Sequence, residues 1–189
     1  MNRKMDTLEA IKTRHTIGKV KADALPRDVI EKLLDAGNDA PNHHKVRPWR
    51  FVVMTGDGRK KLGDVMAASQ AARQPDLPPE TFDKTRALPL RAPAVIAVGV
   101  DKPVDSKPPE LENYAAVAAA CQNILLAAHA LGLGAIWRTG EWVNDLKVKE
   151  FLGFAPDQHI IGFLYVGYPE AVGEFSPRPS FEDRTKWID

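Results

Sequence analysis

The sequence predicts one globular domain that combines helices with a β-sheet. Two observations support this fold class. Helical patterns alternate along the chain with short apolar runs, and the run AVIAVGV from Ala94 to Val100 is apolar at every position, as in a strand buried on both faces. The 189 residues are 44% hydrophobic and 27% charged, which suffices for a sizeable core. Because the sequence contains no repeats, linkers or low-complexity tracts, we expect a single domain over residues 1–189.

Caps and apolar periodicity place the other elements. Proline in the first turn and glycine at the end predict a helix from Pro26 to Gly37, and Gly132 ends a central helix that begins near Glu110. Further helices are expected at Asp6 to Thr13, Gly58 to Ala68, near Glu80 to Ala87, and Asn144 to Leu152. Further strands are expected at Trp49 to Thr55, Ala135 to Arg138 and His159 to Gly167.

The segment from Asn113 to Trp137 contains no Asp, Glu, Lys or Arg and is long enough to cross a bilayer, which takes about 20 residues. Gln122, Asn123 and His129 interrupt it, and alanine, which gains little on transfer into lipid, supplies most of the rest. We therefore expect a long buried central helix and no membrane partner. Such a helix must be surrounded on nearly every side.

Charge and cysteine content narrow the class of protein further. Lys+Arg 26 against Asp+Glu 25 gives a formal net charge of +1, which offers little support for a nucleic-acid partner. The one cysteine, Cys121, is expected to fill space in the core, and a reducing cytoplasmic location fits this usage. The N-terminal stretch MNRKMDTLEAIKTRH lacks an apolar run, so we expect neither a signal peptide nor a membrane anchor.

The usual enzyme signatures are absent from the sequence. Gly132 and Gly134 begin a GxG, but Trp137 stands where a dinucleotide-binding fingerprint needs its third glycine. GxxxxGK[ST], GxSxG and HExxH do not occur. The neighbours His43 and His44 cannot easily meet one metal, so no metal site is expected. Since no nucleophile is evident, a cofactor would have to supply any difficult chemistry.

Two cationic stretches are candidates for holding that cofactor. Arg14, His15 and Thr16 follow a short helix and bring together a guanidinium, an imidazole and a hydroxyl, which suits a phosphate dianion. The alternative is an exposed cationic end that complements the helix dipole. The second stretch, APNHHKVRPW from Ala40 to Trp49, places several cationic or titratable side chains beside a rigid Pro-Trp step.

Four motifs, in this order and spanning most of the chain, resemble the nitroreductase family of FMN flavoproteins, in particular its small, compact bacterial branch. They are RHT at Arg14 to Thr16, APNHHKVRPWRFVV at Ala40 to Val53, GAIWRTG at Gly134 to Gly140, and IGFLYVGYP at Ile161 to Pro169. The resemblance implies a nitroreductase-like α+β fold, with a mixed central β-sheet flanked by helices. It also implies an obligate homodimer with FMN at the interface.

The same resemblance implies roles for individual residues. The RHT element would hold the phosphate and ribityl chain of FMN, the APNHHKVRPW loop would come from the other subunit, and the end of GAIWRTG would lie near the flavin. Pro48 and Trp49 would fix the shape of the loop. The residues assigned to the cofactor in this way are Thr13, Arg14, His15, Thr16, Asn42, His43, Arg47, Trp137, Arg138 and Thr139.

The implied activity is an FMN-dependent reduction of nitroaromatic, quinone or related acceptors, with NADH or NADPH as electron donor. No protein acid or base is required, although His43 is a candidate proton donor; the alternative is an ordinary hydrogen-bonding histidine. Arg47 stands where the family has a neutral amide, and would either raise the flavin's reduction potential or pair with a carboxylate. A different function is also open: a flavin-binding carrier or scaffold of the same fold that does not turn over nicotinamide.

A homodimer would explain further features of the sequence. The central helix could bury its excess apolar face against its symmetry mate. The aromatic residues Phe175, Phe181 and Trp187 of the C-terminal tail could contact the partner subunit. The proline-rich segment 70–93 is expected to be either a lid over the flavin or a solvated connection between a helix and a strand.

Overall fold

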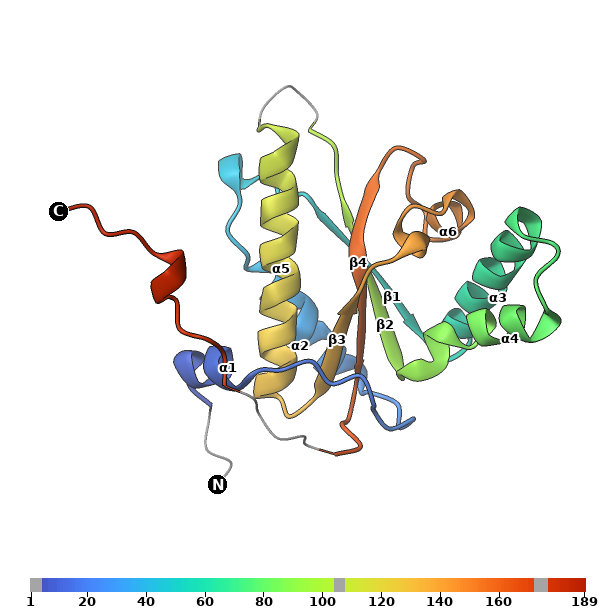
Figure 1. Cartoon of the computed structure of the whole chain (residues 1–189), viewed down its shortest axis with the longest axis horizontal. Helices are drawn as coiled ribbons and strands as arrows, with labels where there is room; N and C mark the ends of the chain where they lie inside the picture. Colours follow the sequence, from blue (N-terminus) through green and yellow to red (C-terminus); the bar gives the residue numbers. More distant parts are fainter. Residues whose placement is uncertain (1–4, 104–107, 172–176) are drawn as a thin grey trace.

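The computed structural model describes residues 5–103, 108–171 and 177–189 (Figure 1). Phe175 lies outside these residues. The described strands form a four-stranded sheet in the order β1-β2-β4-β3. These strands are β1 (Trp49–Thr55), β2 (Ala94–Val100), β3 (Gly134–Arg138) and β4 (His159–Gly167). The predicted bounds of β1, β2 and β4 are confirmed, because each is a compact apolar run.

The expectation of a mixed sheet is wrong for the described part of the chain, because all three strand pairings are antiparallel. The register gives the reason. Thr55, the last residue of β1, lies opposite Ala94, the first residue of β2. The helical connection thus returns to the end of the sheet at which it left, and β2 must run back along β1. The broader prediction of an α+β fold is confirmed.

The helices depart from the predicted bounds mainly at their ends. The proline-rich segment 70–93 is largely helical, since it contains the end of α3, then α4 and the 3₁₀ turn η2. The helices are α1 (Thr7–Thr13), α2 (Arg27–Asn38), α3 (Gly56–Arg73), α4 (Pro79–Arg86), α5 (Glu110–Ala130) and α6 (Leu146–Phe151). The 3₁₀ turns are η1 (His43–Lys45), η2 (Leu88–Arg91), η3 (Glu141–Val143) and η4 (Glu182–Arg184).

The sheet separates two apolar cores (Figure 1). On one face α5 and α2 pack against alternate residues of the strands, with Ile96, Val98 and Leu164 fully buried. On the other face α3 and α6 cover the intervening residues, including Val95 and Phe163. Successive residues of β2 face opposite cores, and β4 also contributes residues to both, with an irregularity in the pairing of the two strands at Val98 and Gly99. This explains why both strands are apolar at nearly every position.

The predicted central helix is α5, and it is buried along most of its length. Val117, Cys121 and Ile124 have no exposed surface. Burial raises the pKa of the Cys121 thiol to about 12, so the residue is inert core filling, as expected. One stripe of α5 nevertheless remains uncovered in the single chain, and Leu111 within it is 77% exposed. No helix among the described residues is both long and apolar enough to span a membrane.

Candidate functional site

The segment after the RHT element lies against the edge strand β3. The N–H of Ile17 donates to the carbonyl oxygen of Ala135 at 3.0 Å. A Cβ placed on Gly18 would lie 4.0 Å from Nη2 of Arg138. The segment that directly follows Arg14–Thr16 therefore contacts the strand that carries Trp137 and Arg138, although more than a hundred residues separate the two groups in the sequence.

Hydrogen bonds fix the imidazole tautomers around Thr13. The Thr13 hydroxyl donates to the carbonyl oxygen of Glu9 at 2.7 Å, so Nε2 of His129, which lies 2.8 Å away, must donate to that hydroxyl. Nδ1 of His15 lies 3.1 Å from the carbonyl oxygen of Thr13 and must also be a donor. Nε2 of His15 is then buried without a hydrogen-bond partner among the described residues.

This arrangement has two consequences. The Thr13 hydroxyl is occupied by its two bonds, so it ties α1 to α5. His129, which interrupts the apolar segment of α5, is half-buried and hydrogen-bonded. Burial lowers its pKa, and the nearby charges of His15 and Arg14 lower it further, which favours the neutral imidazole. The unmet hydrogen-bonding capacity in this cluster therefore lies at His15.

A second guanidinium lies beside Arg14 and was missed by sequence reasoning. Arg178, in the C-terminal tail, donates to the carbonyl oxygens of Ile11, Lys12 and Arg14 at 3.3, 2.9 and 2.5 Å. Arg14 is half-buried, and burial lowers its pKa, as does the charge of Arg178. Cations at the carboxyl end of α1 complement the helix dipole. The two neighbouring guanidinium groups, of Arg14 and Arg178, also repel each other, and a bound anion would relieve this repulsion.

A cavity of about 470 Å³ lies at the end of β3, on the face covered by α3. This volume is within the range of small-molecule sites, about 300–1,000 Å³. The predicted residues Trp137, Arg138 and Thr139 line it. The other lining residues are Met66, Leu88, Arg91, Ile136, Gly140, Glu141, Trp142, Phe163 and Tyr165.

Within this cavity, Arg138 is the predicted residue with unmet hydrogen-bonding capacity. Its Nε is buried without a partner among the described residues, and its Cζ lies 5.6 Å from the ring centroid of Tyr165. Trp137 is different, because its Nε1 donates to the carbonyl oxygen of Ile161 at 3.1 Å. Trp137 thus has a fixed ring that shapes the cavity, whereas Arg138 offers a donor to a ligand.

The loop with the third group of predicted residues has a strained backbone. His44, Lys45 and Arg47 have φ angles of 52°, 56° and 49°, in the left-handed region that non-glycine residues rarely adopt. Each costs about 1–3 kcal/mol, and such strain is concentrated at functional sites. The amide oxygen of Asn42 accepts from the N–H of Arg47 at 2.9 Å and closes the loop. As predicted, the Pro-Trp step anchors it, since the buried Trp49 donates to the Asn38 side chain at 3.2 Å.

This loop does not meet the other two groups within one chain. Nδ1 of His43 lies 2.5 Å from a carboxylate oxygen of Glu112, near the start of α5, whereas Thr13 contacts His129 near its end. At about 1.5 Å per residue these two points lie about 25 Å apart along the helix. The RHT element, beside α1, and the loop with η1 therefore lie near opposite ends of α5 (Figure 1).

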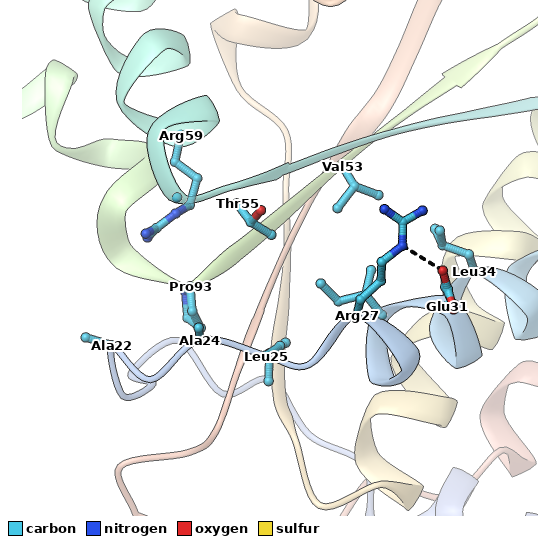
Figure 2. Close-up of a pocket in the computed structure, with 12 residues that line it drawn as sticks. Ala22, Ala24, Leu25, Arg27, Glu31, Leu34, Val53, Thr55, Arg59 and Pro93 are labelled. Carbon is cyan, nitrogen blue, oxygen red and sulfur yellow. Dashed lines mark hydrogen bonds and ion pairs between the residues drawn. The ribbon is translucent and has the colours of Figure 1, made fainter.

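A larger cavity, of about 540 Å³, contains none of the predicted residues (Figure 2). It lies between the start of α2, the end of β1 and the start of α3. Its arginines have partners: Arg27 pairs with Glu31 at 2.8 Å, and Nη1 of Arg59 donates to the carbonyl oxygen of Ala92 at 2.6 Å. Among the described residues, no group of three His, Cys, Asp or Glu side chains is placed to hold a metal ion.

Comparisons with known proteins show the family and the fold. The chain belongs to the nitroreductase family, whose profile matches residues 11–168. "Putative NAD(P)H nitroreductase YdjA" of Escherichia coli is 32% identical over 166 residues, which cover 88% of this chain and 90% of that protein. The "Nitroreductase-like Family Protein from Bacillus cereus" has a TM-score of 0.84 at 27% identity, covering 100% of this chain and 99% of the other.

A further solved structure contains the cofactor in question. It is a "putative nitroreductase in complex with fmn" from Desulfovibrio desulfuricans, with a TM-score of 0.73, 28% identity and 96% coverage of both chains. The residues of the present chain fit such a group. The orphaned Nε2 of His15 and Nε of Arg138 provide buried polar atoms, and the guanidinium groups of Arg14 and Arg178 provide positive charge.

Proposed function

We propose that this protein is an FMN-dependent oxidoreductase that uses NADH or NADPH to reduce nitroaromatic, quinone or related small acceptors. One observation carries the proposal. The segment that directly follows the RHT element lies against β3, and the RHT element and β3 each contribute a buried polar nitrogen without a partner among the described residues, on His15 and Arg138. Buried donors and acceptors are nearly always satisfied, so this pairing supports a resident polar ligand.

Different residues of the chain would bind the two ends of FMN, the phosphate and the ring system. Arg14 and Thr16, with Arg178 beside them, would bind the phosphate, and Nε2 of His15 would accept from a hydroxyl of the ribityl chain. Arg138 and Thr139 would bind near the ring system. When bound, FMN supplies two-electron redox chemistry between NAD(P)H and the acceptor. The apolar side chains that line the cavity would exclude water, which strengthens the interaction of Arg138 with negative charge.

A symmetric homodimer would complete this site. A two-fold axis perpendicular to α5 would pair the uncovered stripe of that helix with its copy in the opposite direction. The loop at the start of one helix would then lie beside the RHT element at the end of the other. Ala115, exposed on this stripe, offers a test: Ala115→Arg is expected to give monomers in sedimentation and to weaken FMN binding together with dimerisation.

Three loop residues, Asn42, His43 and Arg47, have separate roles in this dimer. Asn42 would hold the loop in shape, since its side chain already bonds to the backbone. Arg47 forms no ion pair within the described part of the chain, which leaves its charge for the partner's cofactor. Glu112 orients His43 as a candidate proton donor, and His43→Gln would then lower turnover of acceptors that need a proton while leaving FMN content unchanged.

The visible absorption spectrum of the protein purified without added cofactor is the direct test. A yellow protein that releases about one FMN per chain on heating is the expected result. A colourless protein that fails to take up added FMN would overturn the proposal. Steady-state oxidation of NADH and NADPH with a panel of acceptors then separates the enzyme from a flavin carrier of the same fold, because only the enzyme shows turnover.

A further inference from the structure

We infer that the cavity beside β3 selects acceptors that carry a carboxylate or a comparable anionic group, and that Arg91 is the residue that recognises this group. The inference rests on the proposed function, because this cavity is taken as the place where the acceptor meets FMN. It goes beyond that function, which leaves the charge of the acceptor open.

The charges that line the cavity are unbalanced. Its guanidinium groups are those of Arg91 and Arg138, and Glu141 is the acid among the lining residues. Glu141 is already paired, since its carboxylate lies 2.9 Å from Nη1 of Arg73. In the described part of the chain, no carboxylate pairs with Arg91 or Arg138. The cavity therefore presents two positive charges that its own residues do not compensate.

Arg91 is held firmly at the edge of this cavity although its side chain is exposed. It ends η2, which contains the buried Pro89 and a backbone bond from Leu90 to Ala87 at 3.0 Å. The next residue, Ala92, is anchored by Arg59 through its carbonyl oxygen. The backbone of Arg91 is thus fixed on both sides, so its guanidinium can reach a ligand at little cost in backbone entropy.

Tyr165, which also lines the cavity, lies within the influence of its two arginines. Burial raises the pKa of the Tyr165 hydroxyl, while the charges of Arg138 and Arg91 oppose this rise. Arg91 and Arg138 line the same cavity as Tyr165, and Cζ of Arg138 lies 5.6 Å from the ring centroid of Tyr165. The hydroxyl keeps its proton and makes no hydrogen bond to the described residues, so it is a further donor for an anion.

The remaining walls define the rest of the ligand. Met66, Leu88 and Phe163 are apolar, and Trp142 adds an aromatic surface. A flat aromatic or enone body fits such walls, whereas a fully charged ligand does not. Arg138 is assigned to FMN, and Arg91 comes from η2, a different element. The acceptor that matches these groups is thus a small planar molecule with one anionic substituent.

Binding of two isosteric probes tests the inference without turnover. Benzoate and its neutral counterpart benzamide would be titrated into the FMN-loaded protein by calorimetry, comparing the wild type with Arg91→Gln. A charge-assisted hydrogen bond predicts about tenfold weaker benzoate binding in Arg91→Gln, with benzamide changed by less than about twofold. The matched control is Arg86→Gln, because Arg86 pairs with Asp64 and Asp83 outside the cavity. The control is expected to bind both probes like the wild type.

Turnover provides the second readout. Arg91→Gln should lower kcat/KM about tenfold for 4-nitrobenzoate, through KM, and leave 4-nitrobenzamide nearly unchanged. Equal effects on both acceptors would overturn the inference. The inference would also be overturned if Arg91→Gln lost the preference between NADPH and NADH but still bound benzoate normally. The anion that Arg91 recognises would then be a phosphate of the nucleotide. A wild-type protein that is colourless and fails to take up added FMN would instead refute the proposed function. An FMN-loaded Arg91→Gln variant with an unaltered ratio of benzoate to benzamide affinity refutes this inference alone.

Discussion

Two cavities of the molecule, one at the start of α2 and one at the end of β3, differ in what their arginines do. In the larger one, of about 540 Å³, Arg27 pairs with Glu31, and Arg59 donates to the Ala92 carbonyl (Figure 2). In the smaller one, of about 470 Å³, Arg91 and Arg138 have no such partners among the described residues. Arg59 also has a buried Nε without a partner, but its Nη1 bond commits the side chain to anchoring β2. Unmet hydrogen-bonding capacity, and not volume, distinguishes the candidate site.

The largest effect on FMN binding is expected at Arg14, the residue proposed to bind the phosphate of FMN. Arg14→Ala should weaken FMN binding about 100-fold, because it removes a half-buried cation that makes charge-assisted hydrogen bonds. Equilibrium dialysis with flavin fluorescence measures the change. Lys12→Ala, in the exposed last turn of α1, is the matched control and should bind FMN normally. Equal losses in both variants would mean that general charge, and not a built site, attracts the cofactor.

Filling each cavity in turn tests the comparison directly. Leu88→Trp in the smaller cavity should lower kcat/KM for the acceptor about 30-fold, because the added ring occupies the space the acceptor needs. Leu34→Trp in the larger cavity should leave turnover and FMN content unchanged. Overpacking costs each variant about 1–3 kcal/mol of stability, so thermal unfolding is measured alongside activity. A loss of activity in Leu34→Trp alone would reverse the assignment of the two cavities.

A smaller effect is expected at the tail. Arg178→Ala removes the guanidinium that contacts the end of α1 and should weaken FMN binding about tenfold, less than the change at Arg14. Arg184→Ala serves as the control, because Arg184 lies in the same tail and its ion pair is with the exposed Asp183. If Arg178→Ala unfolds α1 without altering FMN affinity, as circular dichroism and dialysis would show together, Arg178 is a helix cap alone.

The smallest effect concerns pH. The pKa of His129 is lowered in the folded protein, so the unfolded chain binds more protons. The stability that this provides is fully present above the unfolded pKa of about 6.5 and is lost as pH falls through the lowered folded pKa. Urea midpoints should therefore fall between pH 7 and pH 5 slightly more in the wild type than in His129→Gln. Identical pH profiles would show that His129 does not couple to the Thr13 and His15 cluster.

The sequence predicted much of the fold and part of the site. The strands at Trp49–Thr55, Ala94–Val100 and His159–Gly167 were evident because an apolar run is a local signal. The site residues at Arg14–Thr16 and Trp137–Thr139 were found because each group is contiguous in its motif. Arg178 and Arg91 were missed, since neither has a local signal: one lies in a polar tail and the other ends a short turn.

The sequence by itself determined where this chain is helical or extended, which family motifs it carries and which side chains could bind an anion, because these depend on neighbouring residues. The tertiary structure alone decided that the sheet is antiparallel, that the RHT element and the loop with His43 lie at opposite ends of α5, and which arginines remain unpaired. Whether a charge is compensated depends on groups distant in the sequence. Arg91 and Arg73 are the same type of residue, and only folding brings a glutamate, Glu141, to Arg73.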